Sequence, residues 1–329
     1  MKDVGIVGLP ETDAGSVFTA LTAIEGGGGK ASQAVVPVPD TRVDKLVELH
    51  SSKKAVYTQL RFVDTSALVR AGGRAGAGRL PAELLGHLRT SDALLLVVRG
   101  EQAPTDLDEL SLELLYADLE IIQNKLARDI KAARTPEAQR TVAIMERAVT
   151  LLEAGTPLSK ETWTADELEE FQGMAPLTLK PKLVVGVVED GTTTLPDDII
   201  PVAAQLEREV AGMSDEDASE LLAPFGVTER ALPLVIRKVY DALDLLTFLT
   251  AGDTESRAWE VRSGAPAPEA AGAIHSDIQR GFIRAEIVSF EDLVGAGSWS
   301  AARGAGLVRQ EGKTYLMQEG DVVEFRFAV

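Results

Sequence analysis

Short runs made almost wholly of apolar residues recur along the chain and are separated by stretches with helical periodicity. Three lie within residues 1–104, at Val4–Val7, Leu60–Val63 and Ala93–Val98. Two more follow at Leu183–Val188 and Ile199–Ala204. Runs of this length and composition are typical of parallel strands that are buried on both faces of a sheet. The pattern therefore predicts an α/β fold with a mostly parallel sheet.

A different pattern begins at Thr105. Apolar residues recur there at three- and four-residue steps, and the same spacing returns after the polar segment Arg134–Gln139. The repeating positions are Leu112, Leu115, Leu119, Ile122, Leu126 and Ile130, then Val142, Met145, Val149 and Leu152. This spacing predicts two long antiparallel helices that share an apolar seam. We expect the hairpin, residues 105–175, to be an insertion that either carries contacts or has a purely structural role.

The last part of the chain changes character again. Residues 247–329 contain four short strand-like runs, RAWEV, IRAEIV, KTYLM and DVVEFRF, separated by turn-forming residues. We expect a small separate α+β domain here. The α/β domain would then comprise residues 1–104 and 176–246.

Composition excludes several kinds of site. The 329 residues include 33 basic and 51 acidic side chains, for a net charge of −18. An acidic surface disfavours binding to DNA or to nucleic acid in general, although a local basic patch is compatible with it. The absence of cysteine excludes disulfides, thiolate catalysis and Cys-ligated zinc, and three scattered histidines do not predict a metal site. No apolar run approaches the ~20 residues that span a membrane, so we expect a cytoplasmic protein without a membrane partner.

Several strings together resemble the Obg-like ATPase (YchF-type) group of P-loop proteins. They are GIVGLP (5–10), VPVPDTRVDKL (36–46), FVDTSALV (62–69), AAGAIHSDIQRGFIRAEIVSFEDL (270–293) and GDVVEFRFAV (320–329). The resemblance implies a P-loop NTPase-like domain interrupted by a helical hairpin and followed by a β-grasp (TGS, ubiquitin-like) domain. Members of that group bind ATP or GTP with Mg²⁺, hydrolyse the nucleotide slowly and associate with ribosomes, and the resemblance implies the same properties here.

The phosphate-binding loop departs from that resemblance. The motif GxxxxGK[ST] uses glycine to let backbone N–H groups surround the phosphates, lysine to bridge them and a hydroxyl to hold magnesium. Counted from Gly8, the glycine, lysine and hydroxyl positions hold Asp13, Ala14 and Gly15. Only Ser16, the next hydroxyl after position 15, fits the motif, and no lysine or arginine lies between Lys2 and Lys30.

The energetic cost of these changes is large. A lost charge-assisted hydrogen bond costs roughly 1.5–3 kcal/mol, and a carboxylate facing a phosphate adds up to ~4 kcal/mol. Together they would weaken nucleotide binding by roughly 10³-fold or more. Asp13 would avoid the repulsion by turning outward or by capping a helix that starts near Gly15.

Three further parts of the pocket are also altered. The DxxG turn of the family corresponds to Asp64-Thr65-Ser66-Ala67, which keeps the aspartate and loses the glycine. The NxxE string corresponds, across a one-residue gap, to residues 186–189, which keep only Glu189. The threonine-bearing switch loop is replaced by GGGGKASQ (26–33). The remnant pocket would consist of Gly8, Pro10, Gly15, Ser16, Asp64 and Glu189. We therefore expect no catalytic residue and no bound metal or cofactor. If the pocket still binds a ligand, we expect that ligand to be ATP or GTP with Mg²⁺.

The C-terminal domain offers candidate contacts with a partner. They are Arg280, Phe282, Arg284 and Arg309, a set that would suit structured RNA through phosphate contacts and base stacking. The interpretation is a YchF-like pseudo-NTPase that binds the ribosome or structured RNA through its TGS domain and hairpin. Two alternatives stay open: a divergent NTPase whose missing cation comes from a partner, and a protein–protein regulator.

Overall fold

The computed structural model describes residues 1–24, 31–71 and 80–328. The sequence also predicts surface loops at two glycine-rich tracts, GGGGK (26–30) and RAGGRAGAGR (70–79), which lie almost wholly outside these residues. The chain divides into two compact units. One comprises Lys2–Val35 and Arg61–Val235, and the other comprises Met1, Val36–Leu60 and Ile236–Val329. The segment 36–60, which the sequence placed in the α/β domain, thus groups with the C-terminal unit.

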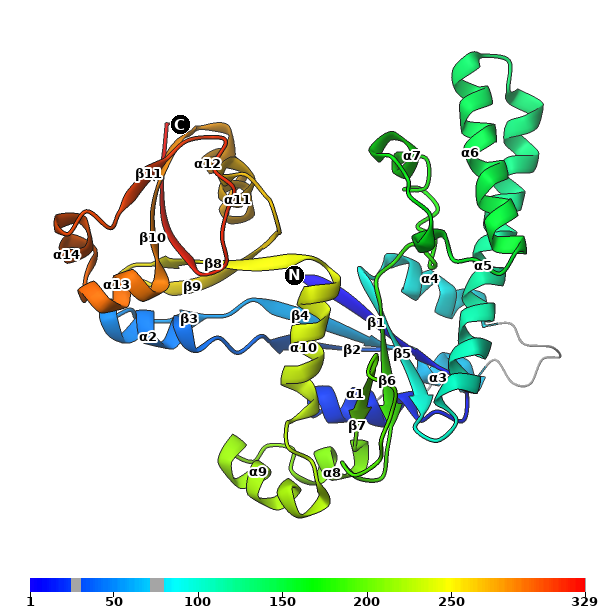
Figure 1. The fold of residues 1–329 in the computed structure, drawn as a ribbon, viewed down its shortest axis with the longest axis horizontal. Coiled ribbons are helices and arrows are strands. Elements are labelled where there is room, and N and C mark those ends of the chain that lie inside the picture. The colour runs from blue at the N-terminus through cyan, green and yellow to red at the C-terminus, as the bar shows by residue number, and fades with distance from the viewer. Residues whose placement is uncertain (25–30, 72–79, 329) are drawn as a thin grey trace. The chain divides into compact units, whose positions relative to one another are not determined.

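The first unit is built on a six-stranded sheet in the order β2-β4-β1-β5-β6-β7 (Figure 1). The strands are β1 (Lys2–Gly8), β2 (Ser32–Pro37), β4 (Gln59–Asp64), β5 (Ala93–Arg99), β6 (Lys182–Val187) and β7 (Ile199–Val202). β1 pairs with β5, β5 with β6 and β6 with β7, all in parallel. Six consecutive residues of β5, Ala93–Val98, are buried, as expected of a central strand with both faces covered. The predicted fold class is confirmed.

Helices of the first unit connect these strands. They are α1 (Ala14–Thr22), α3 (Ser66–Ala71), α4 (Ala82–Thr90), α7 (Ala165–Glu169), α8 (Ala204–Glu209), α9 (Asp215–Leu222) and the 3₁₀ turns η1 (Leu158–Lys160) and η2 (Ala223–Phe225). None of the helices in the described part of the chain is both long and apolar enough to cross a membrane.

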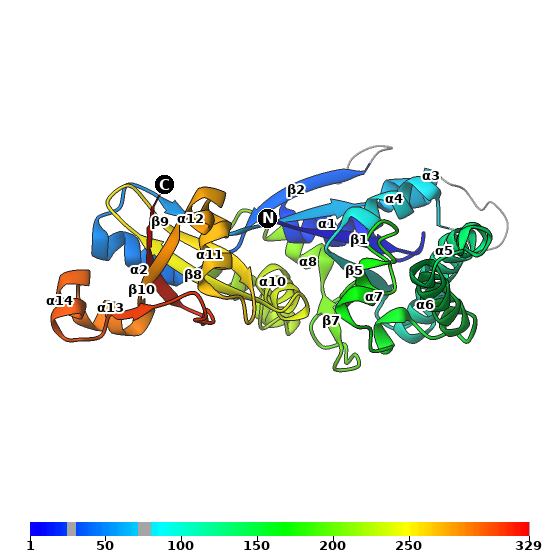
Figure 2. The same ribbon diagram turned by 90° about the horizontal axis from the view of Figure 1, so that it is seen from above.

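The helical hairpin consists of α5 (Ala103–Ala132) and α6 (Pro136–Glu153), which lie side by side in Figures 1 and 2. Its buried seam contains Leu115, Ile122, Ile144, Met145, Ala148 and Leu152. Leu112 and Ile130, which the periodicity placed in the seam, are exposed instead. At the base of the hairpin the fully buried carboxylate of Asp118 accepts hydrogen bonds from the backbone N–H groups of Leu177 and Thr178, at 2.9 and 2.7 Å.

The second unit is built on a sheet in the order β11-β10-β12-β8-β9-β3. The strands are β3 (Ala55–Val56), β8 (Leu245–Ala251), β9 (Ser256–Arg262), β10 (Phe282–Ser289), β11 (Arg309–Glu311) and β12 (Asp321–Phe327). The predicted strand KTYLM (313–317) is wrong: the strand precedes it as β11, and Leu316 makes only an isolated bridge to Pro266.

Both faces of this second sheet are covered. The helices of the unit are α2 (Thr41–His50), most of α10 (Ala231–Ala242), α11 (Ala267–Ile274), α12 (Ser276–Arg280), α13 (Phe290–Ala296) and α14 (Trp299–Gly304). Alternate strand residues point to opposite faces, so Phe248 and Ile287 enter one core while Leu249 and Val288 enter the other. Side chains of α2 belong to the second core, which explains why residues 36–60 group with this unit.

Candidate functional site

The turn between β1 and α1 is closed on itself. The backbone N–H and the hydroxyl of Thr12 both donate to the carbonyl oxygen of Leu9, at 3.1 and 3.0 Å. Thr12 is buried, and a β-carbon on Gly8 would lie 2.0 Å from its hydroxyl oxygen. The threonine side chain therefore fills the interior of the loop, and Gly8 is needed to admit it.

Asp13 stands at the N-terminal end of α1 in the left-handed conformation, with φ 52° and ψ 44°. An aspartate tolerates this region better than most residues do. Its side chain is exposed and makes no capping hydrogen bond, so the expected outward orientation is observed and the expected cap is not. The helix begins at Ala14, one residue earlier than predicted.

Only a very small space remains beneath the loop. It is lined by Gly8, Leu9, Pro10, Asp13, Ala14, Ser66 and Val69. Its volume of about 10 Å³ is at the lower limit for a single water molecule. A phosphate group does not fit into it.

Asp64, at the end of β4, has both carboxylate oxygens engaged. Ser66 donates its backbone N–H to one oxygen at 2.8 Å and its hydroxyl to the other at 3.0 Å. The Asp64 side chain is buried, and its hydrogen bonds with Ser66 support the start of α3. The aspartate that the DxxG turn keeps is thus part of a local turn with Ser66.

A groove of about 1040 Å³ brings together two of the predicted site residues, Ser16 and Glu189, and Asp13 also lines it. Gly15 does not line it, and its carbonyl oxygen accepts a hydrogen bond from the Thr19 hydroxyl at 3.0 Å. The ionisable residues in the lining are Asp13, Glu189, Asp190, Arg208 and Glu209. The groove is therefore predominantly acidic.

Asp190 forms a turn at one side of this groove. Thr192 donates its hydroxyl and its backbone N–H to the same carboxylate oxygen, at 2.6 and 2.9 Å. These hydrogen bonds lower the pKa of Asp190, which stays ionised at neutral pH. The groove thus keeps a permanent negative charge next to Glu189.

The predicted partner contacts of the C-terminal unit have different surroundings. The side chain of Phe282 is a core residue, because it is 5% exposed and lies 6.0 Å from the Phe325 ring, centroid to centroid. It therefore cannot stack on a nucleobase, and the expected contact role for it is not supported.

The three predicted arginine contacts are at the surface, and each is near a partner. Arg280 pairs with a carboxylate on its own helix α12. Arg284 lies 3.6 Å from Glu286, and Arg309 donates to the Tyr315 hydroxyl at 3.1 Å. The ring beside Arg309 is that of Tyr315, and the guanidinium already lies 5.3 Å from its centroid, so that face is not free for a nucleobase.

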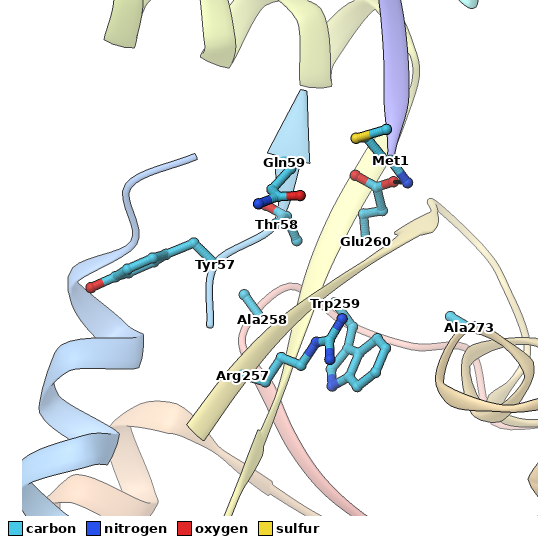
Figure 3. A pocket seen from close by; sticks show the side chains of 9 residues that line it. All are labelled: Met1, Tyr57, Thr58, Gln59, Arg257, Ala258, Trp259, Glu260 and Ala273. Carbon is cyan, nitrogen blue, oxygen red and sulfur yellow. Dashed lines mark ion pairs between the residues drawn. The ribbon is translucent and has the colours of Figure 1, made fainter. Parts of the chain in front are cut away.

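A second cavity, of about 310 Å³, lies within the C-terminal unit (Figure 3). The Met1 ammonium pairs with Glu260 at 2.7 Å, and the Arg257 guanidinium lies 4.0 Å from the centre of the Trp259 ring. The same ring is stacked with Phe248, at a centroid distance of 6.4 Å. Because Trp259 already has both neighbours, it does not offer a free face to a planar ligand.

Comparison with known proteins decides the family. Over 99% of its length the chain is 34% identical to "Ribosome-binding ATPase YchF" of Bacillus subtilis and 36% identical to the protein of the same name from Haemophilus influenzae. In both cases 99% of the relative is covered. The chain belongs to the YchF family of Obg-like ATPases. It is also 32% identical to "Obg-like ATPase 1" of Oryza sativa subsp. japonica, of which it covers 92%.

The family model YchF-GTPase_C, described as "Protein of unknown function (DUF933)", matches residues 245–328. The YchF GTPase of Schizosaccharomyces pombe has a similar structure, with a TM-score of 0.82, 28% identity and coverage of 99% of this chain and 97% of that one. A GTP-binding protein from Pyrococcus horikoshii shares the fold, with a TM-score of 0.57 at 18% identity. The alignment with the Bacillus relative runs over 365 positions, so this 329-residue YchF-family chain lacks segments that the relative has.

The residues of this YchF-family chain do not fit the phosphates and magnesium of a nucleotide. The loop N–H of Thr12 is already bonded within the loop, and the lysine position holds the buried Ala14. Asp64 is committed to Ser66. Among the residues that the structure describes, no group of three or more potential metal ligands converges on one point.

The sequence did not predict the roles of Thr12 and Ser66, whose hydrogen bonds occupy the β1–α1 loop and the Asp64 carboxylate. Thr12 occupies a position at which the motif allows any residue, and Ser66 occupies the third position of the DxxG turn. Neither carries a sequence signal, because each acts by placing a hydroxyl beside a backbone or carboxylate oxygen in the folded loop.

Proposed function

We propose that this chain is a ribosome-binding member of the YchF family that acts in the cytoplasm without nucleotide binding or hydrolysis. The association with ribosomes comes from the relatives named as ribosome-binding ATPases, which match the chain over nearly its full length. The loss of nucleotide chemistry is carried by one observation, the β1–α1 loop closed by Thr12 over a space of about 10 Å³.

Electrostatics supports the same proposal. A nucleotide polyphosphate needs cations and free N–H donors around it. The groove next to the loop instead has four carboxylates and one guanidinium in its lining. Repulsion from these carboxylates disfavours an anionic ligand even if the loop opens.

The experiment is titration calorimetry of the purified chain with ATP and GTP plus Mg²⁺, taken to millimolar ligand. Bacillus subtilis YchF serves as the matched positive control. We expect no heat from this chain, corresponding to a dissociation constant above ~1 mM. A micromolar dissociation constant for either nucleotide would overturn the proposal. Co-sedimentation with ribosomes, with and without nucleotide, then tests the binding part, which we expect to be independent of nucleotide.

A divergent NTPase that receives its missing cation from a partner is the second candidate. The observation that favours it is the groove of about 1040 Å³, which has room for a nucleoside beside Ser16 and Glu189. This candidate requires phosphate release that begins only when ribosomes are added. Measuring ATP and GTP hydrolysis with ribosomes, against ribosomes alone, separates the two candidates.

A further inference from the structure

Three arginine side chains converge on one buried carboxylate in the C-terminal sheet. Glu286 of β10 is 6% exposed. It accepts a hydrogen bond from Arg303 of α14 at 2.6 Å and two from Arg326 of β12, at 3.2 and 3.3 Å. The guanidinium of Arg284, also on β10, lies 3.6 Å away. We call Arg284, Arg303 and Arg326 the arginine cluster.

The arrangement follows from strand register. Arg284 is directly opposite Arg326, and Glu286 is opposite Glu324, so these four side chains share one face of the β10–β12 pair. Like charges placed directly opposite each other repel. Glu286, buried between the strands and the helix, offsets that repulsion, and its pKa is held below the ordinary range by the hydrogen bonds from Arg326 and Arg303.

The cluster has a positive excess in a chain that is otherwise acidic. Three guanidinium groups face two carboxylates, because Arg326 also pairs with Glu324 at 2.7 Å. The three side chains are 45%, 54% and 48% exposed. Each guanidinium has five N–H donors in a planar fork. Of the fifteen donors in the cluster, the hydrogen bonds to Glu286 and Glu324 use one from Arg303 and three from Arg326.

We infer that the arginine cluster binds phosphate groups of the ribosomal RNA backbone. The inference rests on the proposed ribosome association and names the surface through which it occurs. Several planar guanidinium groups held close together match the regularly spaced phosphates of an RNA backbone. Each phosphate can accept two parallel N–H hydrogen bonds from one guanidinium. The sequence predicted that any basic patch must be local, and it identified Arg284 but not Arg303 or Arg326. Those two are brought to Arg284 only by the fold.

The test uses the full chain and ribosomes purified from Bacillus subtilis, with extracted ribosomal RNA as a second probe. Binding is measured by co-sedimentation and by fluorescence anisotropy over a series of salt concentrations. Arg284→Gln and Arg303→Gln, separately and together, remove donors while leaving Arg326 on Glu286. We expect each single change to weaken binding to both probes about tenfold. We expect the slope of log K against log salt to become shallower by about 0.7–0.9 for each phosphate that the variant no longer neutralises.

Matched variants separate charge from geometry and from folding. Arg262→Gln removes a somewhat more exposed arginine, 59%, from the same unit, where it pairs with Glu269, and should leave both the affinity and the salt slope unchanged. The double change Arg284→Lys and Arg303→Lys keeps the charges and should retain most of the slope while losing affinity. Thermal unfolding of every variant should match that of the wild type.

The outcomes distinguish this inference from the proposed function. If the wild type does not sediment with ribosomes, the proposed function itself fails. If the wild type binds ribosomes and the Arg284→Gln/Arg303→Gln variant binds equally well with the same slope, only the arginine surface is overturned. If that variant loses ribosome binding but the wild type does not bind extracted RNA, the cluster contacts a ribosomal protein, and the RNA inference is overturned.

Discussion

The hydroxyl of Thr12 occupies the space that a β-carbon on Gly8 would require, with the two atoms 2.0 Å apart if both were present. The backbone oxygen of Val97 would be a further 3.0 Å contact. Gly8 is the first glycine of a phosphate-loop motif, but in this chain its conformational role is to accommodate a neighbouring side chain.

Gly8→Ala is therefore expected to lower the free energy of unfolding by about 1–3 kcal/mol, the usual cost of overpacking. Thr12→Ala in the same chain should recover part of this loss, because it removes the closest atom. Urea denaturation of the two single variants and the double variant measures the coupling. Gly86→Ala is the control: nothing lies within 4 Å of the added carbon, so this change in helix α4 should stabilise the chain by up to about 1 kcal/mol. Strict additivity of the Gly8 and Thr12 changes would contradict the packing argument.

Rebuilding the motif tests whether the loop or the lysine limits nucleotide binding. Asp13→Gly, Ala14→Lys and Gly15→Ser together restore the motif but leave the hydrogen bonds of Thr12 to Leu9 in place. We expect this triple variant to show no binding of ATP or GTP by calorimetry, and we expect binding to appear only when Thr12→Ala is added. Micromolar binding by the triple variant alone would show that the closed loop opens readily.

Lys182 on β6 predicts a specific pH dependence of stability. Burial lowers its pKa from 10.5 to about 8, and its ammonium donates to the backbone oxygens of Thr178 and Lys180, at 3.2 and 3.3 Å. Between about pH 8 and pH 10.5 the unfolded chain binds more protons at this site than the folded chain does. The contribution of Lys182 to the free energy of unfolding should therefore rise with pH in that window, by at most about 3 kcal/mol.

Lys182→Met should remove this part of the pH dependence and stabilise the chain at pH 7. Burial also lowers the pKa of Lys180, so the difference between wild type and Lys182→Met is the quantity to measure, by urea denaturation at several pH values. A difference that stays constant from pH 7 to pH 10.5 would exclude a depressed pKa at Lys182.

Replacing Asp118 tests how much a buried, hydrogen-bonded carboxylate contributes to the free energy of unfolding. Its carboxylate has no exposed surface and accepts from two backbone N–H groups and from Arg89 at 3.0 Å. Asp118→Ala would leave these donors without their acceptor and should destabilise the chain by about 3–5 kcal/mol. Asp166→Ala is the matched control, since its pair with Arg140 is exposed and 3.5 Å long, and a change within about 0.5 kcal/mol is expected. Equal denaturation midpoints for the two variants would refute the assignment.

The parallel strands were predictable because they are buried on both faces, so that almost every residue carries the same apolar signal. β12 was found with its full bounds, Asp321–Phe327, for the related reason that residues on both faces of its sheet are packed. The segment 313–317 has a similar composition but no strand partner beyond one bridge, and composition alone does not report pairing.

The limits of periodicity are clearest in the hairpin. Leu112 and Ile130 repeat at the spacing of the seam, yet they are exposed, because the position of a second helix decides which of the apolar residues are covered. In the candidate site, the missing lysine was readable from the sequence. The closed loop was not, because it depends on the rotamer of one threonine and on a single carbonyl oxygen.

The anchoring of α5 has a mechanical consequence. Near its start, Asp106 accepts hydrogen bonds from the backbone and side chain of Arg99, and Asp118 is fixed farther along. A helix of 30 residues is about 45 Å long, so roughly its last 20 Å extends beyond Asp118, where its apolar side chains pack in the cluster shared with α6. The hairpin is thus held to the first unit at two points of α5, Asp106 and Asp118, and its far end projects beyond them. A load applied at its free end is therefore transmitted to two places in the first unit, the C-terminal end of β5 at Arg99 and the segment before β6 at Leu177 and Thr178.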